Sequence, residues 1–113
     1  ERGAGKIITV GSGMGHRGAA GGSAYACSKA GLWMLTRVLA QELAEFNICV
    51  NELIPGPVET AMNPNAAKWR DIGGPGGEWY KSPEDIAPLA LFLATQPDVG
   101  PTAQSFSLMH RDT

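Results

Sequence analysis

Charged side chains are scarce in this sequence. Asp, Glu, Lys and Arg make up 18% of the 113 residues, below the usual ~25%, and the formal net charge is −2. The chain therefore has no basic stripe to neutralise the phosphates of a nucleic acid or to hold it on an anionic membrane. Because 43% of the residues are hydrophobic, we expect part of the surface to be covered by another subunit or by a missing part of the same domain.

Cysteine is also rare, and its spacing fits neither a metal site nor a redox motif. Cys27 and Cys49 form no Cys-x-x-Cys or Cys/His ligand pattern, so we predict buried free thiols and no bound metal. No apolar run approaches the ~18 residues that span a bilayer, and no charged segment followed by an apolar one opens the chain. A soluble cytoplasmic protein is the resulting expectation.

Glycine and proline are plentiful, with 15 and 8 residues, and they separate short segments of regular hydrophobic pattern. The patterns predict strand, helix, strand, helix and strand in this order: Lys6–Val10, Ala24 to about Phe46 with Ser23 as N-cap, Ile48–Ile54, a helix beginning at Ser82, and an edge strand over Gln104–Met109. Short β-branched strands that alternate with helices are typical of a parallel sheet in an α/β fold.

The long central helix carries more apolar surface than one buried stripe requires. Leu32, Leu35 and Leu39 follow helical steps, while Trp33 and Met34 widen the apolar surface beyond that stripe. We therefore expect this helix to be buried on more than one side.

Three polar residues form the strongest chemical pattern. Ser12 directly follows the first strand and its glycine, at the strand end where open α/β sheets bind ligands. Tyr25 and Lys29 are four residues apart, so a helix places the phenol and the ammonium on one face. The alternative is an ordinary helix pair with an extended lysine.

The chemistry needs a cation beside the phenol. A free tyrosine has a pKa of about 10, and moving it to ~7 requires about 4 kcal/mol of phenolate stabilisation. An ammonium at ~4 Å in an effective dielectric of ~20 contributes about the same energy. One well-placed lysine is therefore sufficient to make a tyrosine a useful acid or base near neutral pH.

This pattern resembles the signature of the classical short-chain dehydrogenase/reductase family. The resemblance rests on a serine thirteen residues before Tyr-x-x-x-Lys, on an apolar strand before the serine and on Ala30-Gly31 after the lysine. The resemblance implies a Rossmann-type three-layer α/β sandwich with a parallel sheet. It also implies an enzyme that interconverts a small alcohol and a ketone with NAD or NADP. Tyr25 would be the general acid/base, Lys29 would stabilise the phenolate and hold the nicotinamide ribose, and Ser12 would orient the substrate oxygen. Family helices of this kind pair with their twin, which implies a homodimer or homotetramer.

The turn after the second strand adds to the resemblance. Pro55-Gly56-Pro57-Val58-Glu59-Thr60 is similar to the family's Pro-Gly-x-x-x-Thr segment, which wraps the nicotinamide end of the cofactor. By that resemblance Pro55, Gly56, Val58 and Thr60 are cofactor-binding residues, in addition to Tyr25 and Lys29. A plain proline-rich turn is the alternative.

Two further segments are ambiguous from sequence. His16 and Arg17 lie in a glycine-rich loop over residues 13–22, and we interpret them as solvated rather than as substrate contacts because nothing in the sequence fixes their direction. Residues 61–80 combine aromatic side chains with a glycine run. They fit either a flap over the substrate or a surface loop anchored by its aromatics. We treat His110 as a solvated terminal residue.

The resemblance covers residues 1–113 as the carboxyl-terminal half of a family domain. We expect three further family features before Glu1: the glycine-rich turn that binds the cofactor pyrophosphate, the residue that selects NAD or NADP, and the active-site asparagine. A three-stranded sheet cut at one edge is not expected to fold alone. A non-catalytic remnant or subunit-interface piece is the alternative function. An extended relative that catalyses epimerisation or dehydration is disfavoured by the turn after Ile54.

Overall fold

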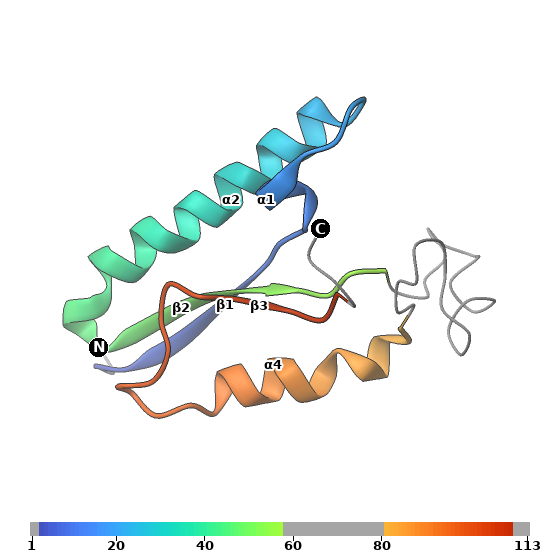
Figure 1. Ribbon diagram of the computed structural model, residues 1–113. Helices are drawn as coiled ribbons and strands as arrows, with labels where there is room; N and C mark the ends of the chain where they lie inside the picture. Colours follow the sequence, from blue (N-terminus) through green and yellow to red (C-terminus); the bar gives the residue numbers. More distant parts are fainter. Residues whose placement is uncertain (1–2, 58–80, 110–113) are drawn as a thin grey trace.

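The computed structural model describes residues 3–57 and 81–109, which form a three-layer α/β arrangement (Figure 1). Strands β1 (Gly5–Val10), β2 (Ile48–Ile54) and β3 (Ser105–Ser107) form one parallel sheet in the order β1-β2-β3. Helix α2 (Ser23–Glu42) covers one face of the sheet and α4 (Ala87–Ala94) covers the other. The short helix α1 (Met14–Arg17) packs against the start of α2.

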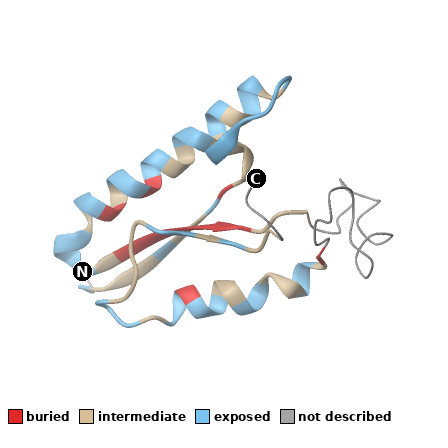
Figure 2. Ribbon diagram, in the orientation of Figure 1, coloured by how far each residue is buried: buried red, intermediate tan, exposed pale blue. Residues whose placement is uncertain are grey.

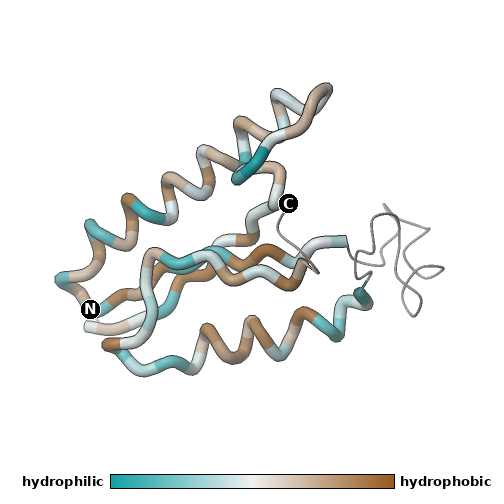
Figure 3. Tube along the Cα trace, viewed as in Figure 1, coloured by the Kyte–Doolittle hydropathy of each residue, from teal (hydrophilic) through white to brown (hydrophobic). Residues whose placement is uncertain are grey.

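The central strand β2 forms the core because both of its neighbours are strands and both of its faces are covered. All of its residues except the first are buried (Figure 2). Hydrophobic residues run along β2 and over much of α4 (Figure 3). The register pairs Thr9 of β1 with Glu52 of β2 and Glu52 with Ser105 of β3, so these three polar residues form one row across the sheet. Thr9 is hydrogen-bonded to the buried Thr36 of α2 over 2.8 Å, which places the row on the α2 face.

The predicted order of strands and helices is confirmed, with differences at several ends. The central helix begins at Ser23, and the cap residue is Gly22 with no side-chain hydrogen bond, so the predicted Ser23 cap is wrong by one position. The α-helix ends at Glu42, and the last turn, Ala44–Phe46, is a separate 3-10 helix. The supposed loop after Ser12 contains α1.

The second helical segment begins at Ser82 as predicted, and the structure shows a capping box there that was not predicted from the sequence. Ser82 and Asp85 exchange hydrogen bonds at the start of a 3-10 turn over Pro83–Asp85, and α4 follows it. The final strand is an edge strand, as predicted, but it is shorter than residues 104–109.

One prediction about burial is wrong: Cys49 is buried, but Cys27 lies on the exposed side of α2. The outer side of α2 is exposed in the single chain, with 54% of Met34, 48% of Leu35 and 40% of Val38 accessible, so burial of this helix on more than one side stays a prediction. The helix buries one side because the described residues provide a single sheet face for it.

Asn47 separates the last helical turn from β2 by adopting a left-handed conformation, with φ 58° and ψ 36°. Alanine is disfavoured in this conformation by roughly 1–2 kcal/mol, whereas glycine adopts it freely. In the full-length protein we expect Asn47→Ala to lower the free energy of unfolding by about 1 kcal/mol and Asn47→Gly to change it by less than about 0.5 kcal/mol. Denaturant unfolding measures both values, and equal values for the two variants would contradict the assignment.

Candidate active site

A cavity of about 230 Å³ opens at the carboxyl ends of β1 and β2. Its lining includes Ser12 from the segment after β1, Tyr25 from α2 and the Pro55–Pro57 turn after β2. Ser12 and Tyr25 therefore border the same space, although they are 13 positions apart in sequence. This is the strand end at which parallel α/β sheets hold their ligands.

Ser12 is placed by the end of the β1–β2 pairing. The Gly11 N–H donates a hydrogen bond of 2.9 Å to the Leu53 carbonyl, which extends the strand ladder to the residue before Ser12. The Ser12 Oγ then accepts a hydrogen bond of 3.1 Å from the Met14 N–H at the start of α1. The hydroxyl is partly buried and retains the capacity to donate its proton to a bound oxygen.

Tyr25 and Lys29 lie one turn apart on α2, as their spacing predicts. The Lys29 Nζ is 5.8 Å from the centre of the Tyr25 ring, within the range of a cation–π contact. It also donates a hydrogen bond of 3.4 Å to the Val10 carbonyl of β1. Tyr25 is 51% exposed, and Lys29 lies beside the ring without lining the cavity.

Gly15 holds the serine segment against the tyrosine helix. A Cβ at this position would lie 2.7 Å from the Lys29 backbone carbon and 2.9 Å from the Ala30 nitrogen. Contacts this short do not occur for real Cβ atoms, so α1 packs this closely only because residue 15 is glycine. The position of Ser12 relative to Tyr25 and Lys29 therefore depends on backbone packing between α1 and α2.

The turn after β2 closes the other side of the cavity. Gly56 has a φ of 71°, which favours glycine, and the Lys81 N–H donates a hydrogen bond of 3.0 Å to the Pro57 carbonyl. The turn therefore lies next to the start of the second helical segment. Val58 and Thr60, the other predicted cofactor-binding residues, lie outside the described residues. So do His110 and residues 61–80, which the sequence left open between a flap and a surface loop.

Sequence reasoning missed a buried acid beneath this site. Glu52 is fully buried in β2, and its Oε1 accepts a hydrogen bond of 2.7 Å from the Ser105 Oγ and lies 2.7 Å from the His16 Nε2. Its Oε2 has no hydrogen-bond partner and lies against Gly11, the residue before Ser12. The one available signal was that Glu52 is the only charged residue in an otherwise uncharged strand.

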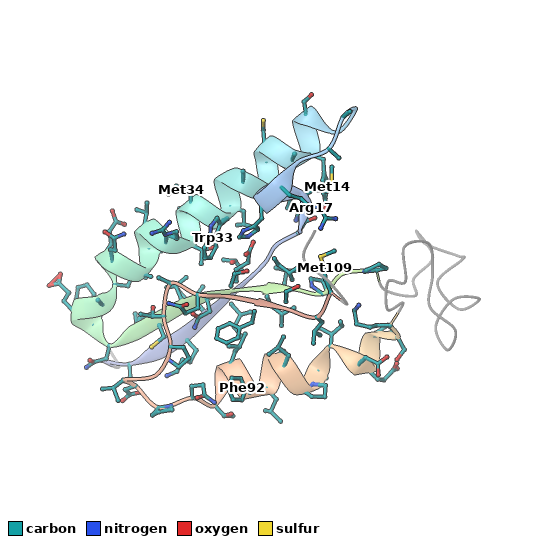
Figure 4. All side chains as sticks on the ribbon, in the orientation of Figure 1. Met14, Arg17, Trp33, Met34, Phe92 and Met109 are labelled. Carbon is teal, nitrogen blue, oxygen red and sulfur yellow. The ribbon has the colours of Figure 1, made fainter. Side chains whose placement is uncertain are left out.

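His16 is exposed, as interpreted from the sequence, but it lies in α1 rather than in a loop, and the pairing with Glu52 fixes the direction of its side chain. Its ring lies 5.0 Å from the Trp33 ring, centre to centre, and bridges α1 to the core of the sheet. Figure 4 shows Trp33 on the sheet side of α2 and Met34 on the outer side. Arg17, by contrast, is exposed and lines the cavity.

Comparison with known proteins decides which family has this arrangement. The family model described as short chain dehydrogenase matches residues 1–71, which include Ser12, Tyr25, Lys29 and the Pro55–Pro57 turn. The chain belongs to the short-chain dehydrogenase/reductase family. The resemblance inferred from the Ser and Tyr-x-x-x-Lys pattern is thereby confirmed.

Similar short-chain dehydrogenase/reductases share the fold. The 3-oxoacyl-acyl-carrier-protein reductase FabG of Chlamydia pneumoniae is 42% identical, with 89% of this chain and 42% of that protein aligned. A short-chain dehydrogenase/reductase of Serratia marcescens is 34% identical with a TM-score of 0.75, covering 96% of this chain and 45% of that one. A variant of actinorhodin polyketide ketoreductase, solved with NADPH, is 30% identical with a TM-score of 0.76, covering 95% and 46%.

These likenesses confirm the predicted Rossmann-type α/β architecture. The chain spans less than half the length of each of these short-chain dehydrogenase/reductases. Among residues 3–57 and 81–109, no helix is long and apolar enough to cross a membrane. The same residues contain no group of three His, Cys, Asp or Glu side chains placed to hold a metal ion.

Proposed function

We propose that this chain is the carboxyl-terminal half of an NAD(P)-dependent short-chain dehydrogenase/reductase domain that interconverts an alcohol and a carbonyl compound. One observation carries the proposal: Ser12 and Tyr25 line one cavity at the carboxyl ends of β1 and β2, with Lys29 beside the Tyr25 ring. Names of similar proteins support it, because FabG and the actinorhodin protein are reductases of carbonyl groups.

In the reducing direction, Tyr25 donates its hydroxyl proton to the carbonyl oxygen of the substrate, and it takes the proton back in the oxidising direction. The positive charge of Lys29 stabilises the tyrosinate that remains after donation. Ser12 donates a hydrogen bond to the same oxygen, which orients the carbonyl and stabilises the charge that develops on it. The cavity admits the substrate between these groups and the turn after β2.

The residues present fit the nicotinamide end of a dinucleotide. The cavity combines the apolar side chains of Ile54, Pro55 and Met109 with two hydroxyl groups, which suits a flat ring with polar substituents. Tyr25, Lys29, Pro55 and Gly56 would hold this end of the cofactor, together with Val58 and Thr60. The bound cofactor supplies or accepts the hydride. The NADPH named for the actinorhodin structure supports a nicotinamide cofactor without distinguishing NAD from NADP here.

Exposed apolar surfaces support a larger domain and a homo-oligomer. Within the described residues β1 pairs with a strand on one side only, and Ile7 and Val10 are 38% and 56% exposed. Further parallel strands beside β1 would cover this edge and supply the phosphate-binding half of the domain. The exposed Met34, Leu35 and Val38 of α2 would pack against the same helix of a second subunit. A cytoplasmic location stays a prediction.

Cofactor titration distinguishes the proposed enzyme from the non-catalytic remnant. We expect the full-length protein to bind NADH or NADPH saturably, with a change in nicotinamide fluorescence as the ring enters the apolar cavity. A non-catalytic remnant, which keeps the site residues without using them, would show no saturable binding of either dinucleotide. Saturable binding without turnover of any alcohol or ketone would also contradict the catalytic proposal.

A further inference from the structure

A second cavity, of about 430 Å³, adjoins the proposed active site. The two cavities share Gly13, Arg17, Ile54 and Met109, so they meet at the residue that follows Ser12. The second cavity extends between α1 and the end of the sheet, where it is lined by the polar side chains His16, Ser105 and Ser107. A substrate held at Ser12 and Tyr25 therefore has space to extend toward these groups.

Arg17 is the cation at the junction. Its Nη1 lies 3.4 Å from the position that a Gly13 Cβ would occupy, so the guanidinium lies against the backbone beside Ser12. Figure 4 shows Arg17, Met14 and Met109 gathered at this end of the sheet. Among residues 3–57 and 81–109 the ion pairs are Lys6 with Asp98 and His16 with Glu52, so no described carboxylate neutralises Arg17.

The short helix that carries Arg17 is held in place on two sides. His16 pairs with the buried Glu52 and packs on Trp33, and Gly15 packs on the backbone at Lys29. These contacts fix the position of the helical turn from which Arg17 projects, which the sequence left open. A guanidinium presented from an anchored element loses less entropy on binding than one on a free loop.

The charges around the second cavity favour an anion. The described residues that line it include no acid. Glu52, which contacts the lining residues His16 and Ser105, is fully buried, and its Oε1 is hydrogen-bonded to both. The polar side chains that line the cavity are His16, Arg17, Ser105 and Ser107. The Ser105 hydroxyl proton and the His16 Nε2 are engaged with Glu52, which leaves the Arg17 guanidinium and the Ser107 hydroxyl to donate hydrogen bonds to an anion. Arginine binds carboxylate and phosphate groups through two parallel hydrogen bonds.

We propose that Arg17 binds a carboxylate or phosphate group of the substrate, so that the preferred substrate is an acidic carbonyl compound. The carbonyl lies between Ser12 and Tyr25, and the anionic group lies at the junction, with Ser105 and Ser107 beyond it. This assignment rests on the proposed oxidoreductase function and specifies its substrate class. It makes Arg17 a specificity-determining residue that contacts substrate without taking part in proton transfer.

The test compares matched substrates on the full-length protein. Reduction rates are measured for an oxo acid and its methyl ester, and for a phosphorylated carbonyl compound and its unphosphorylated form. We expect Arg17→Gln to lower kcat/KM for the preferred acid about 10- to 100-fold, mainly through KM, and the neutral partner by less than about 3-fold. Arg17→Lys should restore part of the loss. Arg37→Gln, which removes an exposed positive charge from α2, away from both cavities, is the control and should change neither value.

The outcomes separate this inference from the function on which it rests. The anion site alone is overturned if Arg17→Gln lowers kcat/KM equally for the acid and its ester. It is also overturned if the unmodified protein turns over the ester better than the acid. A weaker Kd for NADPH in Arg17→Gln assigns Arg17 to a cofactor phosphate and also overturns it. Undiminished turnover in Tyr25→Phe overturns the proposed function and this inference together.

Discussion

Replacing Tyr25 with Phe in the full-length protein is expected to lower kcat about 10³-fold, within the 10²- to 10⁴-fold range for a general acid or base. The variant keeps the ring beside the Lys29 ammonium and removes only the hydroxyl of a residue that lines the cavity with Ser12. The Kd for NADH or NADPH should stay within a few-fold, because the ring and the turn after β2 remain. Steady-state kinetics and fluorescence titration measure the two quantities.

The control for this experiment is Ser23→Ala, which removes an exposed hydroxyl from the first turn of the same helix. It should leave kcat and Kd unchanged. If Tyr25→Phe retains more than about a tenth of the turnover, another group transfers the proton and the assigned role is wrong. If kcat and cofactor affinity fall together, Tyr25 acts in binding rather than in proton transfer.

Gly11→Ala is expected to have the largest effect on stability. A Cβ on Gly11 would overlap the Glu52 Oε2 and lie 2.5 Å from Cδ and 2.8 Å from Cγ of the same side chain. Glu52 cannot move aside without breaking its hydrogen bonds to Ser105 and His16 in a fully buried position. We therefore expect a loss of about 3 kcal/mol in the free energy of unfolding of the full-length protein.

Two comparisons show whether the Glu52 contact causes this loss. In a Glu52→Ala background the added methyl group meets no carboxylate, so Gly11→Ala should cost less than about 1 kcal/mol there. Gly5→Ala, at the other end of β1, is the control, because its Cβ would lie an ordinary 3.7 Å from Ile48 Cγ1. An equal loss from Gly11→Ala with and without Glu52 would show that crowding at Glu52 is not the cause.

The sequence by itself determined the type and order of the three strands and of the helices α2 and α4, but not α1, and it identified the family. These features depend on residues close together in the chain. The β-branched run over Lys6–Val10 and the apolar run over Ile48–Ile54 indicate strands, and Asn47 ends a helical segment through its own backbone preference. The spacing of Tyr25 and Lys29 similarly needs only the helical repeat to bring the two side chains to one face.

The tertiary structure alone decided what surrounds the site. Glu52 and His16 are 36 positions apart, and their contact requires α1 to fold back over the sheet and β3 to bring Ser105 to the same row. The exposure of Cys27, the anchoring of Arg17 and the meeting of two cavities beside Ser12 follow from the same packing. Periodicity encodes which side of an element is apolar, but the partner of a buried polar group depends on how distant elements pack together.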